Sequence, residues 1–248
     1  MACEDTRHTR KLLNHFGVSV RTLSYHDRNA KEQCDKLVTL LQQGRSIALV
    51  SDAGTPGVSD PAYRLVRECH LKHLRVVPIP GPSAATASVS VCGLPSDMFL
   101  FVGFLPRKVG PRKSKLISLN KVGCTLIFFL PPHRLSFQLA EIEEVLGNRP
   151  AFLAREMTKI HESFSWGTVR EIQGSIESTP LKGEYTLIVA GAVTPDIPSQ
   201  PKVDVAAYVV GLQRLRGLSR SAAIRQTAID LEEPKNAIYR ATVEKKRV

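Results

Sequence analysis

The stretch Val50-Ser51-Asp52-Ala53-Gly54-Thr55-Pro56-Gly57-Val58-Ser59-Asp60-Pro61 decides the fold class of this chain. It follows an apolar run, Ile47 to Val50, that is typical of a strand, and it precedes a helix-like segment, Tyr63 to Cys69. Its glycines and proline predict a tight loop whose backbone can approach a ligand closely. Since ligands of open α/β sheets bind at the carboxyl ends of strands, we expect a small-molecule site at this loop. An ordinary strand-to-helix turn would also account for the pattern.

A second loop of the same kind follows about twenty residues later along the chain. Arg75 to Pro78 is predicted to be a strand, and Ile79 to Ala87 a rigid turn that opens a helix of small residues, with Ser83 as its N-cap. The first loop lacks the G-x-G-x-x-G pattern, and no P-loop motif occurs in the chain. Neither a Rossmann dehydrogenase nor a nucleotide hydrolase is therefore favoured.

The remainder of the first 194 residues alternates between predicted strands and helices. Glu4 to Phe16 is an amphipathic helix with Leu12, Leu13 and Phe16 on its apolar face, Thr22 to Tyr25 is a short strand, and Lys31 to Gln43 is a second helix. This alternation predicts an α/β protein whose first domain, residues 1–95, holds a mostly parallel sheet. A second α/β domain, residues 96–194, would carry a helix from Arg134 to Leu146 and strands at Phe99 to Gly103, Thr125 to Leu130, Ala151 to Glu156 and Tyr185 to Ala190.

Residues 195–248 differ in kind from the rest. A proline-rich linker, Pro195 to Pro201, precedes helical patterns at Val205 to Leu215, Ser221 to Leu231 and Pro234 to Val243. They predict a small basic extension that resembles a helix-turn-helix unit and binds RNA. A helical brace against the second domain or a partner subunit is the alternative. The candidate phosphate contacts are Arg220, Arg225, Lys235 and Arg240.

The charge balance points to a polyanionic partner. The formal net charge is +11 and the isoelectric point is about 9.6, and a basic surface steers a protein toward nucleic acid. A dispersed excess of lysine would instead only aid solubility. A cluster around Gly110 favours nucleic acid, because it predicts a mobile basic loop that contacts phosphates; its members are Arg107, Lys108, Arg112, Lys113 and Lys115.

The composition predicts a cytoplasmic protein. No apolar run is long enough for a membrane span, and the amino terminus lacks the pattern of a secretory signal. The five cysteines are dispersed and show no C-x-x-C spacing. We therefore expect reduced thiols, with neither a disulfide framework nor a zinc or other metal site.

Five ordered motifs together resemble the bacterial ribosomal RNA small subunit methyltransferase I family of the tetrapyrrole-methylase superfamily. They are Glu4 to Leu13, Ser51 to Pro61, Ile79 to Ala84, Phe101 to Lys108 and Arg155 to Glu162. The resemblance implies a two-domain α/β fold with S-adenosylmethionine in the cleft between the domains. It also implies 2′-O-methylation of a cytidine in 16S rRNA of the small ribosomal subunit, by a homodimer.

The resemblance implies the residues of the donor site position by position, whereas the RNA contacts also rest on the clustering of basic residues and the catalytic candidates on the chemistry of methyl transfer. The methyl donor would bind at Asp52, Ala53, Gly54, Thr55, Gly57, Ser83, Ala84, Leu130 and Ala190. RNA would bind at Arg10, Arg107, Lys108, Lys159, Arg220 and Arg225. The catalytic residues would be Glu4, Arg7, Arg155 and Glu156.

The chemistry explains why these residue types are candidates. Methyl transfer is an in-line displacement, so the enzyme mainly positions the ribose hydroxyl and excludes water. A proton acceptor assists a weak hydroxyl nucleophile, and Glu4, Asp5, Glu156 and His161 are the candidates. Acidic residues at Glu4 and Asp5 would also simply favour a helix start.

Two departures from the family pattern keep other functions open. Family members have a strand and a Pro-x-x-Ile-Gly-Asn-Leu loop upstream of the Glu-Asp-Thr-Arg motif, whereas Met1 lies three residues before Glu4. We therefore expect the first strand and one wall of the cleft to be absent from this sequence. Leu130-Pro131-Pro132 stands where the family usually has Glu-Ser-Pro, so that donor contacts there would come from the backbone. The missing strand leaves a non-catalytic RNA-binding remnant as one alternative. The other is a methyltransferase acting on a porphyrin or corrin precursor, which would share the fold and the donor but would not need the basic tail or the Arg107 to Lys115 cluster.

Overall fold

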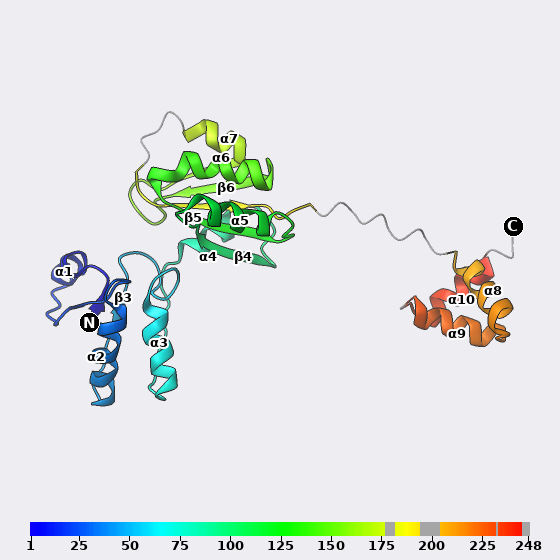
Figure 1. Cartoon of the computed structure of the whole chain (residues 1–248), viewed down its shortest axis with the longest axis horizontal. Helices are drawn as coiled ribbons and strands as arrows, with labels where there is room; N and C mark the ends of the chain where they lie inside the picture. Colours follow the sequence, from blue (N-terminus) through cyan, green and yellow to red (C-terminus); the bar gives the residue numbers. More distant parts are fainter. Residues whose placement is uncertain (177–181, 194–203, 232, 245–248) are drawn as a thin grey trace. The chain divides into compact units, whose positions relative to one another are not determined.

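The structure is a computed structural model of the 248-residue chain and describes residues 1–176, 182–193, 204–231 and 233–244. The predicted linker, Pro195 to Pro201, lies outside the described residues. The chain divides into two compact units, Met1–Ala192 and Val193–Val248, which are described separately (Figure 1).

A short parallel sheet organises the amino-terminal lobe of the first unit. Its order is β2 (Leu23–Ser24), β1 (Ala2–Cys3), β3 (Leu49–Val50), and both pairings are parallel, as the alternating pattern predicts. The helices of this lobe are α1 (Thr6–His15), α2 (Ala30–Gln42) and α3 (Ala62–Leu71). Its apolar core is built from both layers, and includes Ala2, Tyr25, Cys34, Leu37, Val38, Leu65 and Cys69.

Two predictions for this lobe are wrong. Arg75 to Pro78 is not a strand, because it has no ladder partner among the described residues and leaves Val76 and Val77 exposed. Helix α1 buries Thr9 and Leu13, whereas Leu12 and Phe16 are exposed. The buried face of α1 is therefore narrower than predicted and consists of Thr9 and Leu13, which are four residues apart.

A five-stranded mixed sheet forms the centre of the second lobe. Its strands, in chain order, are β4 (Phe99–Phe104), β5 (Thr125–Leu130), β6 (Pro150–Arg155), β7 (Ser163–Thr168) and β8 (Tyr185–Val189), and their spatial order is β4-β5-β8-β6-β7. Strands β4 and β5 are parallel, whereas β8 runs antiparallel to both β5 and β6. Strands β4, β5 and β6 therefore end at the same edge of the sheet.

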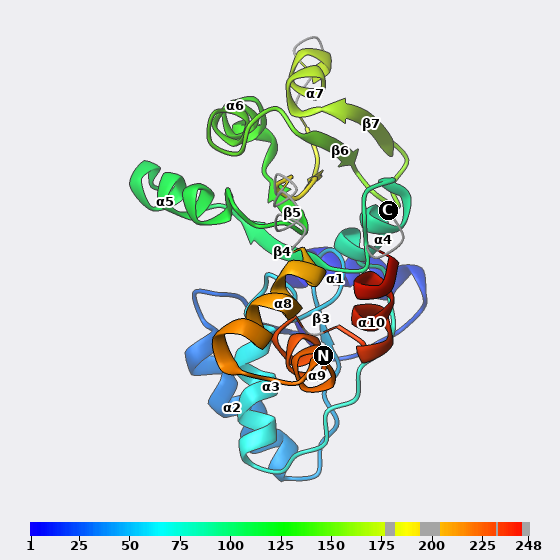
Figure 2. The ribbon, with the colours of Figure 1, turned by 90° about the vertical axis from the view of Figure 1, so that its right-hand side faces the viewer.

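Helices cover the two faces of this sheet unequally. The main core packs one face against α5 (Val109–Leu119), α6 (Leu135–Leu146) and α7 (Val169–Ile176). The other face packs on α4 (Ala84–Val91), whose Ala85 and Val89 meet Phe152 and Ile188. Figure 2 shows α5 and α6 on the side of β5 that faces away from α4. A short 3-10 helix, η1 (Pro132–Arg134), follows β5.

The predicted mobile basic loop is wrong in one respect. Residues from Val109 onward form α5, and Arg112 is buried with a relative exposure of 2%. Arg107 and Lys108, which precede the helix, are exposed as expected. The prediction placed every basic residue of the cluster in solvent. In the structure, the guanidinium of Arg112 instead forms a buried ion pair with the carboxylate of Glu141.

The second unit contains α8 (Val205–Arg216), α9 (Arg220–Asp230) and α10 (Lys235–Glu244), so all three predicted helices are confirmed. Asp204 and Ser219 accept hydrogen bonds from backbone N–H groups at the starts of α8 and α9. A small core holds the helices together, with Val209, Leu212, Ala223, Ile224 and Ile238 buried. No helix among the described residues of either unit is both long and apolar enough to span a membrane.

Candidate donor and substrate site

The loop after β3 is open and backbone-rich. Residues Asp52, Ala53, Gly54 and Gly57 are exposed, and the two glycines have φ angles of 70° and 89°. L-residues rarely adopt these angles, so the loop conformation depends on glycine. The Asp60 carboxylate fixes the far side of the loop, because Oδ1 accepts from the N–H groups of Gly57 at 2.7 Å and Ala62 at 2.8 Å.

The second predicted donor loop lies against the first. The Thr55 hydroxyl donates to the Pro82 carbonyl at 2.9 Å, which joins the loops directly. Ser83 is the N-cap of α4, as predicted, yet its hydroxyl forms no capping hydrogen bond within the described part of the chain. The two loops therefore present backbone groups, small side chains and an uncommitted hydroxyl at one place.

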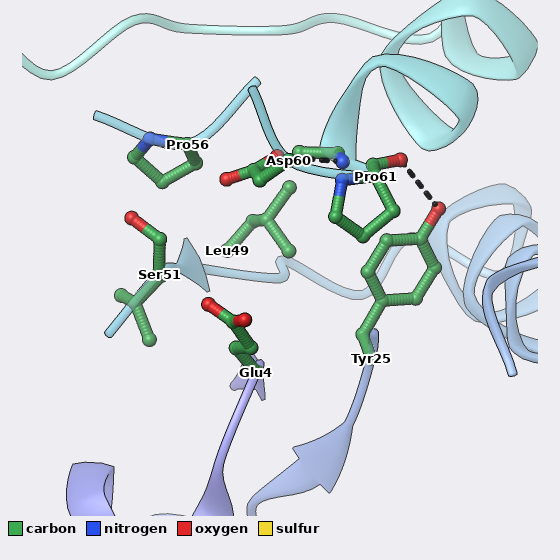
Figure 3. A pocket seen from close by; sticks show the side chains of 9 residues that line it. Glu4, Tyr25, Leu49, Ser51, Pro56, Asp60 and Pro61 are labelled. Carbon is green, nitrogen blue, oxygen red and sulfur yellow. Dashed lines mark hydrogen bonds between the residues drawn. The ribbon is translucent and has the colours of Figure 1, made fainter. Parts of the chain in front are cut away.

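Glu4 borders a small hollow beside the first loop. Figure 3 shows its carboxylate pointing into this hollow, with Ser51, Pro56 and Asp60 around it. The Tyr25 hydroxyl donates to the Pro61 carbonyl at 3.3 Å, and burial raises the pKa of this phenol to about 12. Tyr25 is therefore a neutral wall of the hollow, and Glu4 is its exposed acidic group.

Asp5 has a structural role at the start of α1. Its carboxylate accepts from the Arg7 backbone N–H at 2.8 Å and from the Arg7 guanidinium at 2.9 Å. The hydrogen bonds from the Arg7 side chain and backbone hold the pKa of Asp5 far below its usual range. The Asp5 N–H in turn donates to the Asp52 carboxylate at 3.3 Å, so the Glu4 to Leu13 motif contacts the donor loop.

The common edge of the five-stranded sheet gathers the remaining motifs. Strand pairing places Phe104, Leu130 and Arg155 at this edge, where β4, β5 and β6 end. Two features bring this edge close to the first donor loop and to the helix that follows the second. A Cβ on Gly103 would lie 2.9 Å from the Ser59 hydroxyl, and the Ser88 hydroxyl of α4 donates to the Met157 sulfur at 2.9 Å.

The turn after β6 is held by charged side chains. Glu156 has a φ of 50°, and its carboxylate accepts from Lys159 at 3.0 Å and from the Glu184 N–H at 2.8 Å. The hydrogen bond from Lys159 lowers the pKa of Glu156. Burial lowers the pKa of Lys159, but hydrogen bonds to Glu156 and Glu184 outweigh it, so that the pKa of Lys159 rises. Both predicted site residues are thus bound to protein partners.

Arg155 is half-buried beside this turn. Its Nε donates to the Lys182 carbonyl at 3.2 Å, and its guanidinium lies 5.9 Å from the Tyr185 ring centroid. These contacts orient the side chain at the sheet edge. His161 is exposed on the following loop.

One predicted donor residue does not lie with the others. Ala190 follows β8, and because β8 is antiparallel to β5, this residue lies at the opposite end of the sheet from Leu130. Its N–H donates to the Pro150 carbonyl at 2.9 Å. The antiparallel pairing thus places Leu130 and Ala190 at opposite ends of β5 and β8.

Several positioning residues were missed by the sequence reasoning. Asp60, Ser88 and Glu184 connect or fix the motifs through the hydrogen bonds described above. Asp60 lay inside the quoted loop, where an aspartate before a proline and a helix is a common turn former. No local pattern could have paired Ser88 with Met157, since 69 residues separate them.

The family model for Tetrapyrrole (Corrin/Porphyrin) Methylases matches residues 2–173. This chain belongs to the tetrapyrrole methylases. The predicted α/β fold class is that of this family, and helices α8, α9 and α10 lie beyond the matched residues. Tetrapyrrole methylases are S-adenosylmethionine-dependent methyltransferases, and this member is therefore an enzyme of that class.

Relatives of this tetrapyrrole methylase include proteins named ribosomal RNA small subunit methyltransferase I. The Synechocystis protein is 43% identical over 98% of this chain and 88% of its own length. The Mesorhizobium japonicum protein is 45% identical over 99% of this chain and 83% of its own length. The Escherichia coli O157:H7 protein is 41% identical over 98% and 85%, respectively. The recognition made from the five motifs is confirmed.

Solved structures agree on the fold. The methyltransferase CobJ aligns with a TM-score of 0.55 and 18% identity over 77% of this chain and 83% of that one. Diphthine synthase aligns with a TM-score of 0.55 and 15% identity over 73% of each chain. At these identities the likeness concerns the fold alone.

The residues present fit the methyl donor of this tetrapyrrole methylase. Exposed loop backbone at Asp52 to Gly57 and the uncommitted Ser83 hydroxyl can hold the polar groups of S-adenosylmethionine, and Ala84 leaves room beside them. Among the residues with a described position, no three histidine, cysteine or acidic side chains group closely enough to hold a metal ion.

Proposed function

We propose that this tetrapyrrole methylase transfers a methyl group from S-adenosylmethionine to the 2′-oxygen of a cytidine in 16S rRNA of the small ribosomal subunit. The observation that carries the proposal is that hydrogen bonds join the first three motifs at one place. Motif one contacts the first donor loop through Asp5 and Asp52, and that loop contacts the second through Thr55 and Pro82. The names of the relatives support ribosomal RNA as the substrate.

The donor would be held by the two adjacent loops. We propose that Asp52 binds a polar group of the donor, that Gly54 and Gly57 offer backbone groups, and that Ser83 supplies its hydroxyl. Ala53, Thr55, Ala84 and the backbone at Leu130 would line the same site. When bound, S-adenosylmethionine supplies an electrophilic methyl group on a sulfonium.

Glu4 is the proposed proton acceptor for the ribose hydroxyl. Its carboxylate is exposed, and the only described group that approaches it as a donor is the Asp52 N–H, at the long distance of 3.5 Å. Glu156 suits that role less well, because Lys159 and Glu184 already occupy its carboxylate. We assign Glu156 the task of holding the turn that carries Arg155, and Arg155 the task of orienting the substrate.

RNA would be bound through exposed basic groups on several elements. Arg10 is exposed on α1, and Arg107 and Lys108 are exposed at the end of β4. Arg7, one turn before Arg10, is exposed as well but is paired with Asp5, and we propose that it stabilises charge at the reacting centre. Arg220 and Arg225 are exposed on α9 of the second unit. Lys159 would contact a phosphate only by exchanging its carboxylate partners, since it bridges Glu156 and Glu184.

The proposal is tested by incubating the purified chain with unmodified small ribosomal subunits and S-adenosylmethionine that carries a labelled methyl group. Nuclease digestion followed by mass spectrometry should find the label on the ribose of one cytidine. Glu4→Gln should lower kcat by about a hundredfold or more, the range of general base catalysis. The matched control is Glu32→Gln, at an exposed position of α2, and it should leave kcat unchanged.

Other outcomes would select an alternative function. Label on a base would refute the 2′-oxygen as acceptor. Methylation of a porphyrin or corrin precursor but not of rRNA would favour the second enzymatic candidate. Failure of the folded chain to bind S-adenosylhomocysteine in calorimetry would favour a non-catalytic RNA-binding remnant.

The proposed function also comes with an expected oligomeric state and an expected location in the cell. We expect a homodimer that acts in the cytoplasm, where small ribosomal subunits would be its substrate. Light scattering coupled to size exclusion measures the first expectation directly, and a monomer at micromolar concentration would contradict it.

A further inference from the structure

Arg112 is a buried cation whose hydrogen bonds reach the chain just before its own helix. Its Nη1 donates to the Arg107 carbonyl at 2.8 Å and to the Pro106 carbonyl at 3.2 Å. Its Nε and Nη2 donate to the Glu141 carboxylate of α6, with 3.1 Å for Nη2. The side chains of Arg112 and Glu141 are 2% and 6% exposed.

The arrangement uses the planar geometry of the guanidinium. One side of the fork binds a carboxylate on α6, while Nη1 holds two consecutive carbonyls of the segment after β4, a combination that a lysine cannot reproduce. The Phe137 ring of α6 lies 4.7 Å from the guanidinium carbon and closes one face of the group. Leu105, directly before the held segment, is buried in the main core.

The held segment ends in the exposed basic pair Arg107 and Lys108. Lys108 is the N-cap of α5, and its carbonyl accepts from the Arg112 N–H at 3.1 Å. The backbone of this pair is therefore fixed by Leu105, by the Arg112 side chain and by the first turn of α5. Both side chains remain in solvent. A fixed backbone lowers the entropy lost when these side chains bind a phosphate.

We propose that Arg112 and Glu141 are a positioning pair that presents Arg107 and Lys108 to the phosphate backbone of the RNA substrate. This inference rests on the proposed function, because it takes RNA as the substrate. It assigns neither Arg112 nor Glu141 a contact with RNA. The pair acts only through the carbonyls of Pro106 and Arg107.

The test separates positioning from stability with two variants of the full chain. Arg112→Lys keeps the charge but loses the fork that holds the carbonyls. The double variant R112M/E141L removes both charges, so that no unpaired buried charge remains, and such replacements are often neutral for stability. Thermal unfolding and S-adenosylhomocysteine binding establish that each variant is folded.

Both variants should raise KM for small ribosomal subunits by about tenfold, while kcat and S-adenosylhomocysteine affinity stay within about twofold. The slope of log K for RNA binding against log salt should become shallower, because fewer phosphates are neutralised. The matched control is Arg170→Lys, whose parent residue pairs with Glu143 of the same helix α6 at 2.6 Å. This control should change none of these quantities.

A double-mutant cycle gives the sharpest result. In a chain that already carries Arg107→Ala and Lys108→Ala, adding Arg112→Lys should raise KM by less than about twofold, because the groups that it positions are gone. An additive effect would overturn the proposal, and so would a loss of S-adenosylhomocysteine binding in both variants. Absence of RNA binding by the unsubstituted chain would refute the proposed function together with this inference, and it would be seen before any substitution is made.

Discussion

At the scale of the residue, the carboxylates of the candidate site differ in how many hydrogen bonds they accept. Asp5 and Glu156 accept hydrogen bonds from basic side chains and backbone N–H groups, and their pKa values are lowered by those bonds. Glu4 faces a hollow with one long contact from the described part of the chain. The surroundings of these three acidic residues, and not their residue type, therefore decide which of them is open to a substrate.

Replacement of Glu156 by glutamine should make stability less dependent on pH. The pKa of Glu156 is lowered in the folded chain by its bond to Lys159, so its contribution is present above the ordinary carboxylate pKa and is lost as pH falls through the folded value. Glu156→Gln should therefore lower Tm near neutral pH, and the difference from the unsubstituted chain should vanish in acid. Thermal unfolding across a pH series measures this. Glu144→Gln, at an exposed pair with Lys113, serves as the control and should have little effect.

Arg155→Ala should abolish methylation of small ribosomal subunits while S-adenosylhomocysteine binding remains intact. The Lys182 carbonyl and the Tyr185 ring hold the guanidinium at the sheet edge, and we propose that it orients the substrate there. Single-turnover methylation and calorimetry on the same preparation check both statements. Undiminished methylation by this variant would remove Arg155 from the site.

At the scale of the element, strand direction decides which loops can cooperate. Strands β4, β5 and β6 share a direction and bring their carboxyl ends to one edge, whereas β8 carries Ala190 to the other. The bulge in β4 between Phe101 and Gly103 lies next to that edge. Gly103 has a φ of 69° and approaches Ser59 of the first donor loop, so β4 lies close to the amino-terminal lobe at this point.

Gly103→Ala should destabilise the chain by about 1–3 kcal/mol, because a left-handed backbone is costly for alanine and its Cβ would lie 2.9 Å from the Ser59 hydroxyl. Adding Ser59→Ala should recover only the part due to the contact, since the backbone strain remains. Denaturant unfolding measures both variants. Gly174→Ala on α7 is the control, and it should stabilise by about 0.5–1 kcal/mol, because no described heavy atom lies within 4 Å of the new Cβ.

At the scale of the whole molecule, a net charge of +11 is distributed over two units. The first unit contains the donor loops and the edge with Arg155, and the second contains α8, α9 and α10 around a small core of its own. Exposed Arg220 and Arg225 lie on α9. If the second unit binds RNA, a change of charge on α9 should alter the affinity for the RNA substrate and leave the affinity for the methyl donor unchanged.

The double reversal R220E/R225E should therefore weaken RNA binding and reduce its salt dependence by the equivalent of about two phosphate contacts. Filter binding over a salt series measures the slope. A matched double reversal on the first unit, K31E/K36E on α2, changes the net charge equally and should lower affinity much less. Equal losses would show that only overall charge matters, and the second unit would then be a brace.

The sequence by itself determined the family, the parallel first sheet and most helices, because periodicity, caps and loop glycines are local properties. The five motifs were also readable in order, and their chemistry pointed to a methyl donor and a polyanion. Only the tertiary structure decided the buried Arg112–Glu141 pair, the contact of Ser88 with Met157 and the separation of Leu130 from Ala190. These features depend on strand direction and on partners that lie tens of residues apart in the sequence. The local sequence pattern around either partner does not indicate such a pairing.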